Sequence, residues 1–480
     1  MKTSGETKDT QQPEQPESNQ YYLEKAPLGR AVAHLSIPMM LGMSVGTVYN
    51  VVNAYFIGLL HNTAMMSAIT LGLPIFTVLM AAGNVFGVGA GTFITRLVGG
   101  GTPEQGKRVA GYAFYGSLIA GLLIALASFL FMVPLVNSLG ADASTHDYTK
   151  IYAMTLIGGG FVIVMNFALE QLVRSEGASK QSMYGIFIST GLSLILDPLL
   201  ILGLDLHVMG AALAMILANA GSALYYVYFL QKKSEHLQGF IRYIRLSLRD
   251  QWEVYKIGIS ELFKSAFMIV TTLLFNHYMI EYGSNVLAGA GIGLRIVQIP
   301  EFLAMGLFIG MIPFFAFNYA RPNIPRFRAG FNASAAVIGA VSVVFVGLVY
   351  LLRDPVMRLF SSDPAVLEAG TYILGAMLVS ALFNGFTGLF LTLFQAAGQG
   401  MPTMVLSVTQ GVLYIPTIIV LHAMFGLHGV IWSMTVTEVI TCLLGLILYV
   451  PFRIKLKDLQ KNHSLSYPDP DRMAGGINVR

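Results

Sequence analysis

Charged residues are scarce in this sequence. They make up 11% of its 480 residues, against ~25% in an ordinary soluble protein, while 55% of the residues are hydrophobic. A single Cys excludes both a disulfide framework and a CxxC metal site. Apolar stretches near the ~20 residues that a membrane span needs recur almost to the C-terminus. The composition therefore predicts an all-α polytopic membrane protein.

Motifs for catalysis and metal binding are also missing. Gly101–Lys107 has the GxxxxGK spacing of a phosphate loop, but Arg108 stands where the Mg²⁺-binding Ser or Thr belongs. No HExxH or EF-hand sequence occurs. His422 and His428 are close in sequence without a third ligand nearby. We expect no enzyme activity, no cofactor and no nucleic-acid partner.

The apolar runs divide the chain into twelve predicted spans. Residues 1–30 are polar and contain no apolar signal-peptide core, so we expect a cytoplasmic N-terminal tail. The spans lie near residues 31–60, 65–97, 108–139, 150–173, 183–203, 209–230, 257–281, 286–317, 329–351, 368–393, 401–422 and 428–452.

The basic residues predict the orientation. Of the 29 Lys and Arg residues, 24 lie in the tails and in the loops after even-numbered spans, and three lie in the loops after odd-numbered spans. The remaining two, Lys264 and Arg295, fall inside spans. By the positive-inside rule both termini are expected in the cytoplasm, which places the protein in the inner (cytoplasmic) membrane.

The two halves of the chain repeat each other. Arg174–Gly177 matches Gln395–Gly398 at an offset of 221 residues, and Gly210 matches Gly429 at an offset of 219. Six spans separate the copies, so both have the same orientation, and a pseudo-twofold axis along the membrane normal relates them. We predict two six-helix bundles at 31–230 and 257–452, a basic linker at 231–256 and a C-terminal tail at 453–480. Within the linker, Phe240–Arg249 is expected to form an interfacial amphipathic helix.

Asp197 is the most informative intramembrane charge. It lies about 14 residues into the fifth span, and Pro198 frees a backbone carbonyl near Leu194. A carboxylate beside a free carbonyl is suited to a cation or a proton. The alternative is a helix kink that carries a buried, protonated Asp.

Glu170 and Arg174 are four residues apart at the cytoplasmic end of the fourth span. They form either an ion pair or a site in which Glu170 faces the same cavity as Asp197. Tyr49, Asn50 and Asn53 add neutral polar groups in the first span, and Tyr49 and Asn53 share one helix face.

In the second half, internal ion pairs are expected between Glu261 and Lys264 and between Arg295 and Glu301. On this interpretation Arg295→Ala damages folding, because it leaves buried acids unpaired. Glu438 in the last span is isolated and occupies the place of Asn219 in the repeat.

Several stretches between Leu35 and Pro451 together resemble one family of membrane transporters. They are Ser36–Met40, Tyr49–Asn50, Tyr55–Gly58, Arg174–Lys180, Leu196–Leu200 and Gly210–Ala214. These sequences resemble the multidrug and toxic compound extrusion (MATE) transporters, and the tail sequence and Arg295 look closer to the DinF- and MepA-like branch than to the NorM branch.

The resemblance implies a monomeric antiporter that exports small amphiphilic, often cationic, compounds in exchange for Na⁺ or H⁺. Carried over from the family, the coupling site consists of Asp197, Glu170, Asn53, Tyr49, Ser193 and Tyr152, with a monovalent cation expected at Asp197 and Asn53. The family's first-span acid is replaced by Asn53. Either Glu170 supplies the missing carboxylate, or Asn53 disables coupling.

The resemblance also assigns residues of the second half. The acid of the NorM branch in the tenth span aligns with Asn384, so that site is expected to be absent. Glu261, Lys264, Arg295, Glu301, Asn384 and Glu438 are expected to line the substrate cavity or to carry structural charge. A lipid-linked oligosaccharide flippase is the alternative, although it requires a strongly basic cavity. An intramembrane enzyme is disfavoured because no catalytic constellation is present.

Overall fold

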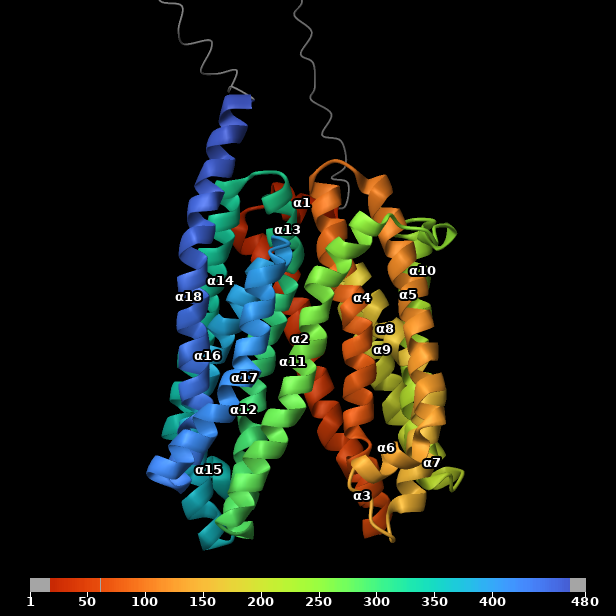
Figure 1. Cartoon of the computed structure of the whole chain (residues 1–480), viewed down its shortest axis with the longest axis vertical. Helices are drawn as coiled ribbons and strands as arrows, with labels where there is room; N and C mark the ends of the chain where they lie inside the picture. Colours follow the sequence, from red (N-terminus) through yellow and green to blue (C-terminus); the bar gives the residue numbers. More distant parts are fainter. Residues whose placement is uncertain (1–17, 61, 467–480) are drawn as a thin grey trace, which may run out of the picture.

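The structure is a computed structural model that describes residues 18–60 and 62–466. The side chains of residues 47, 48, 50, 51, 54 and 462–466 lie outside this description, and the predicted role of Asn50 falls among them. The described elements are helices that form two bundles side by side (Figure 1). Both described ends of the chain lie at one end of the molecule, which we call the terminal face.

The N-terminal bundle follows a short helix, α1 (Asn19–Glu24), that packs against the other bundle. The elements of the N-terminal bundle are α2 (Leu28–Gly58), α3 (Thr63–Leu71), α4 (Leu73–Gly99), α5 (Pro103–Leu130), α6 (Met132–Ser138), α7 (His146–Gly158), α8 (Gly160–Ser175), α9 (Ser179–Pro198), the π-helical turn η1 (Leu199–Gly203) and α10 (His207–Lys232).

The C-terminal bundle has the same plan. Its elements are α11 (Leu248–Glu281), α12 (Ser284–Gly310), α13 (Ile312–Ala320), α14 (Ile324–Leu351), α15 (Arg353–Arg358), α16 (Pro364–Ala396), α17 (Gly400–Phe425) and α18 (Leu427–Ser466).

The twelve predicted spans agree with these helices. Eleven helical segments of the described chain are long and apolar enough to cross a membrane, and the bent pair α7–α8 makes the twelfth. This pair bends by 51° at Gly158, Gly159 and Gly160, where three consecutive glycines weaken the helix. The chain is a multi-pass membrane protein.

The predicted interfacial helix Phe240–Arg249 is wrong. Only the single 3₁₀ turn η2 (Phe240–Arg242) forms, and α11 begins at Leu248 behind the N-cap Ser247. The segment lies directly on α5, because a Cβ at Gly111 would overlap the carbonyl oxygens of Phe240 and Tyr243. The Tyr115 hydroxyl of α5 donates to the carbonyl of Ile241 over 2.9 Å, whereas in a continuous helix that carbonyl would accept from its own backbone.

The two bundles touch in the half of the molecule nearest the terminal face. Gly89 of α4 packs against the backbone of Val254, and Gly258 of α11 packs against the backbone of Val85. Gly310 of α12 approaches the carbonyl of Leu35 in the same way. Glycines permit such close backbone contact between membrane helices. Toward the opposite end, α4 and α11 diverge (Figure 1).

Candidate functional site

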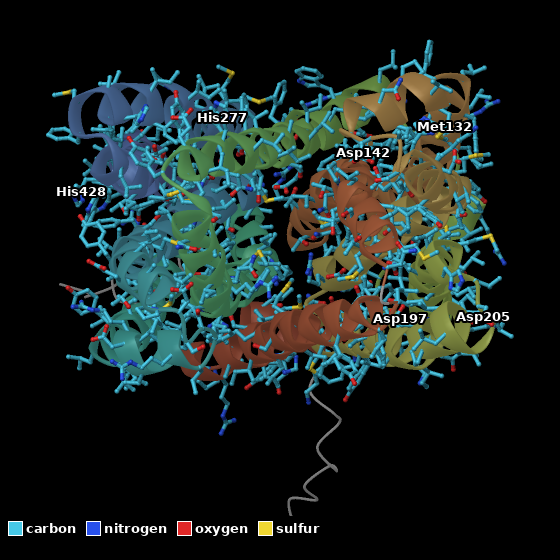
Figure 2. The ribbon with its side chains drawn as sticks, turned by 90° about the horizontal axis from the view of Figure 1, so that it is seen from below. Met132, Asp142, Asp197, Asp205, His277 and His428 are labelled. Carbon is cyan, nitrogen blue, oxygen red and sulfur yellow. The ribbon has the colours of Figure 1, made fainter. Side chains whose placement is uncertain are left out.

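Asp197 lies at a break in the fifth span. Its α-helix ends at Pro198, and the chain continues as the π-helical turn η1. A proline removes one backbone donor, and π-helical turns are often found at functional sites. The Asp197 side chain is nevertheless only 1% exposed. Figure 2 shows it where α2 and α9 lie side by side.

Two side chains of α2 bind the Asp197 carboxylate. The Tyr49 hydroxyl and the Asn53 amide Nδ2 each donate to Oδ2 over 2.9 Å, and Asn53 Nδ2 also donates to the Tyr49 hydroxyl over 3.1 Å. Tyr49 and Asn53 reach the same oxygen because residues four apart share a helix face.

Two further predicted residues lie beside this group. Ser193, one helical turn before Asp197 on α9, is buried and lies near the Tyr49 hydroxyl. Tyr152 of α7 is buried, and the Tyr152 hydroxyl lies near enough to Asp197 to interact electrostatically with the carboxylate. The structure therefore brings Tyr49, Asn53, Tyr152, Ser193 and Asp197 together, and we call these five residues the Asp197 cluster.

The Asp197 cluster contains no base. Among the described residues, no Lys, Arg or His forms an ion pair with Asp197. A buried carboxylate without a basic partner is costly unless hydrogen bonds, a proton or a cation compensate it. Such a group can exchange one positive charge with its surroundings. No three His, Cys, Asp or Glu side chains in the described part of the chain are grouped to hold a metal ion.

Glu170 does not join the Asp197 cluster. It forms the i,i+4 ion pair with Arg174, with 2.8 Å between Oε1 and the guanidinium, and both side chains are buried. Glu170 lies five residues from the end of α8, whereas Asp197 lies 18 residues along the antiparallel α9. At ~1.5 Å per residue this separates the two acids by roughly 20 Å in depth. Glu170 and Asp197 therefore cannot contact each other in one cavity.

The C-terminal bundle contains one of the two predicted ion pairs. Glu261 pairs with Lys264 over 2.6 Å and accepts a hydrogen bond from Gln395 Nε2 over 2.7 Å. The predicted ion pair between Arg295 and Glu301 is wrong. Arg295 is exposed, and it forms no ion pair with any described residue. Six residues make about one and two-thirds turns, so the two side chains leave α12 on different faces.

Glu438 belongs to a polar group that the sequence predicted only in part. Its Oε1 accepts hydrogen bonds from Gln410 Nε2 over 2.5 Å and from Asn384 Nδ2 over 3.3 Å. In the N-terminal bundle the equivalent helices carry Asn166, which donates to Asn219 over 2.8 Å. Asn166 and Gln410 were missed.

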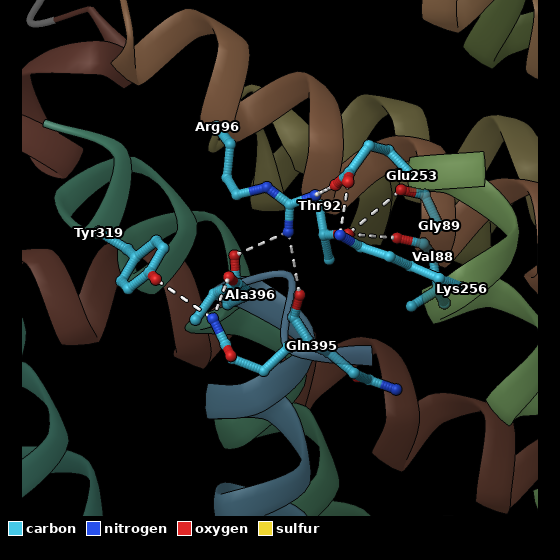
Figure 3. A network of polar contacts seen from close by, with 11 residues as sticks. Val88, Gly89, Thr92, Arg96, Glu253, Lys256, Tyr319, Gln395 and Ala396 are labelled. Carbon is cyan, nitrogen blue, oxygen red and sulfur yellow. Dashed lines mark hydrogen bonds and ion pairs between the residues drawn. The ribbon is translucent and has the colours of Figure 1, made fainter. Parts of the chain in front are cut away.

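Arg96 was also missed, because the sequence places it among the loop charges. It lies in the last turn of α4, and its guanidinium crosses to the other bundle (Figure 3). There it donates to the carbonyls of Gln395 and Ala396 over 3.5 and 3.4 Å, and it pairs with Glu253 over 3.3 Å. Arg96 therefore ties the bundles together at the terminal face.

Two helical bundles with polar groups buried inside each define the class of the protein, a two-bundle membrane transporter. The same fold occurs in solved structures at 23% sequence identity. An "outward-facing conformation of a multidrug resistance MATE family transporter of the MOP superfamily" matches with a TM-score of 0.85, over 93% of this chain and all of that one. A MOP superfamily transporter from Pyrococcus furiosus matches with a TM-score of 0.84, over 92% and 98% of the two chains.

The chain belongs to the MatE family, whose model matches residues 38–199 and 257–420. It is 37% identical over 436 residues to "Multidrug export protein MepA" of Staphylococcus aureus (strain NCTC 8325 / PS 47), which covers 91% of this chain and 96% of the relative. The protein of the same name from Staphylococcus haemolyticus (strain JCSC1435) is 37% identical over 437 residues, with the same coverage. The predicted family resemblance is confirmed.

Proposed function

We propose that this protein is a secondary active exporter of small amphiphilic, often cationic, compounds, driven by inward movement of Na⁺ or H⁺. The relatives named as multidrug export proteins support export. The charge asymmetry of the loops supports a position in the inner membrane with both termini in the cytoplasm. The exporter works as a monomer and needs no cofactor besides its coupling ion and no nucleic acid.

The observation that carries this proposal is the Asp197 cluster. Its carboxylate is buried, receives two hydrogen bonds and has no basic partner in the described chain. Binding a cation or a proton removes this charge, whereas release restores it. Because α2 and α9 both contribute, the charge state alters their packing and biases the bundle between two forms. A monovalent cation at this site would be held by Asp197, the Tyr49 oxygen and, once the amide that now donates to Asp197 has rotated, the side-chain oxygen of Asn53.

The conformation fits the same cycle. With the terminal face in the cytoplasm, the glycine contacts and Arg96 close the cytoplasmic side, and α4 and α11 diverge toward the opposite side (Figure 1). The bundles 31–230 and 257–452 then move as two bodies joined by 231–256. Arg295 is exposed within a span, which is tolerable where water rather than lipid faces it.

Transport by purified protein in vesicles tests the proposal. Ethidium uptake into everted proteoliposomes would be recorded under a Na⁺ gradient alone and under a pH gradient alone. Uptake above that of empty vesicles under either gradient is expected. If neither gradient drives ethidium uptake and a fluorescent lipid-linked phosphate crosses the membrane instead, the result would favour the flippase alternative. That alternative is disfavoured by Lys264, whose charge is already paired with Glu261.

A further inference from the structure

A second acid without a base lies inside the C-terminal bundle. Glu438 of α18 is 8% exposed, and its Oε1 accepts from Gln410 of α17 and Asn384 of α16. Its Oε2 is shielded from solvent and has no hydrogen-bond partner in the described part of the chain. The nearby Thr387 hydroxyl donates instead to the carbonyl of Phe383 over 3.2 Å.

The titratable groups that face Glu438 are Glu301 of α12 and Cys442 of α18, and neither supplies a positive charge. None of the described Lys, Arg and His side chains pairs with Glu438. Glu301 is close enough for the two carboxylates to repel each other. Two acids that share an apolar environment cannot both be ionised cheaply.

The unpartnered oxygen favours a proton over a metal ion. Both amides donate their N–H groups to Oε1, so their oxygens are turned away from the carboxyl. A cation would need several oxygens converging on Oε2. A proton on Oε2 requires only that atom and removes the cost of the buried charge.

The acid is not required to hold the helices together. At the equivalent place in the repeat, Asn219 accepts a hydrogen bond from Asn166 and donates to the carbonyl of Met215. A neutral amide therefore connects the same two helices in the N-terminal bundle. An acid at this place adds a group that can gain or lose charge, and an amide cannot do so.

We propose that Glu438 and Glu301 share one transferable proton and form a second protonation site in the C-terminal bundle. The O–H bond on Glu438 Oε2 breaks as one forms on Glu301 through intervening water, and the negative charge moves the opposite way. Glu301 is half-buried on α12, one helical turn from the exposed Gln298. On this proposal Glu301 is the exit toward solvent. This site deepens the proposed function by adding a proton step.

Infrared difference spectroscopy on the full chain in nanodiscs tests the site without any transport. A pH titration records the carbonyl stretching band of protonated carboxyl groups. Glu438→Gln is expected to abolish one such band, whereas the matched control Glu104→Gln, an exposed acid, leaves the bands unchanged. Asp197→Asn identifies the band of the N-terminal bundle separately, so failure of the proposed function and failure of this site are distinguishable.

Unchanged bands in a folded Glu438→Gln protein would overturn the proposal. Loss of the Glu438 band on adding NaCl at fixed pH would also overturn it, because the site would then bind a metal cation. If the Glu438→Gln protein does not fold, the Glu301→Gln protein tests the proposal instead. Removing the repelling charge is expected to shift the titration midpoint of the Glu438 band to lower pH, and an unshifted midpoint contradicts a shared proton.

Discussion

The two bundles bury their unpaired acids at different places of the same repeat. In the N-terminal bundle the acid is Asp197, which precedes Pro198. At the equivalent place the C-terminal bundle also has a proline, Pro416, but the residue before it is Ile415. In the C-terminal bundle the acid is Glu438, where the N-terminal bundle has Asn219. The difference teaches that helix packing does not require either acid, since the sister bundle packs without it.

The loops at the terminal face differ in the same way. The N-terminal bundle carries the buried pair Glu170 and Arg174, followed by Glu176. The repeat-equivalent residues of Arg174 and Glu176 are Gln395 and Ala397. Gln395 reaches across to Glu261 instead of pairing within its own helix. The N-terminal bundle therefore concentrates its charge in one short segment, and the following predictions test what that charge does.

Asp197→Asn is expected to abolish gradient-driven export and to leave the fold intact. The substitution keeps the volume but removes the only charge of the Asp197 cluster, so one form of the bundle loses its cation-dependent stabilisation. Ethidium uptake in proteoliposomes and thermal unfolding would be measured, with the exposed Asp205→Asn as the matched control. Full export by the Asp197 variant would move the coupling site to the C-terminal bundle.

Glu170→Gln is expected to destabilise the protein rather than to uncouple it. It leaves the buried Arg174 guanidinium without a counter-charge, which costs about 3–5 kcal/mol. A fall in the unfolding temperature is expected, whereas Glu104→Gln in an exposed pair should change it little. An unchanged unfolding temperature with altered coupling would restore Glu170 as the functional partner of Asp197.

Glu176→Gln is expected to remove a pH dependence of stability. Burial, helped by the charge of Glu235, raises the pKa of Glu176 to about 7 even though Ser234 and backbone amides donate to it. The unfolded chain has the ordinary value of 4.5. The folded state therefore favours the proton, and this stabilisation is complete below the unfolded pKa.

The stabilisation by Glu176 is lost as the pH rises through about 7. The difference amounts to about 3 kcal/mol. Denaturant unfolding from pH 5 to pH 8 should show a decline in the wild type that is absent in Glu176→Gln. Equal declines in the two proteins would contradict the assignment.

Arg96→Gln is expected to loosen the closed terminal face. It removes the charged hydrogen bonds to Gln395, Ala396 and Glu253, which together contribute about 1–3 kcal/mol. Spin labels at the exposed residues Glu104 and Met401, in a Cys442→Ser background, would report a larger population of long distances. Lys107→Gln is the control, and an unchanged distance distribution would show that glycine packing alone closes this face.

Asn53→Asp has the smallest expected effect, a several-fold tighter binding of the coupling cation. Asn53 donates to Asp197 over 2.9 Å, so an acid there would place two carboxyl groups in contact. Two such groups share one positive charge more readily than either holds it alone. The cation concentration at half-maximal ethidium uptake would be measured. Weaker binding would show that the Asn53 donor is itself needed.

Much of this molecule could be predicted from local properties of the chain. Apolar runs reveal spans because a helix must satisfy its own backbone in lipid. The residues around Asp197 were predicted by family resemblance and helix spacing. The segment Phe240–Arg249 was mispredicted because its amphipathic pattern carries no information about its contacts with Gly111 and Tyr115 of α5.

Side-chain partners required the tertiary structure. Arg295 and Glu301 were paired on proximity in sequence, yet the helix turns them to different faces. Glu170 and Asp197 were both assigned to one coupling site, but antiparallel helices place them at different depths. From the sequence Arg96 was assigned to the loop charges. Only the assembled bundles show that its carbonyl acceptors lie 299 and 300 residues away in the chain.

The sequence by itself determined the membrane spans, the repeat, the family and the identity of the deep acids, because hydrophobicity, spacing and charge are properties of the local chain. The tertiary structure alone decided that Asp197 is held by Tyr49 and Asn53, that one oxygen of Glu438 has no partner among the described residues, and that Arg96 joins the bundles. The physical reason is that a buried polar group is defined by its partners, and those partners come from helices that are distant in sequence.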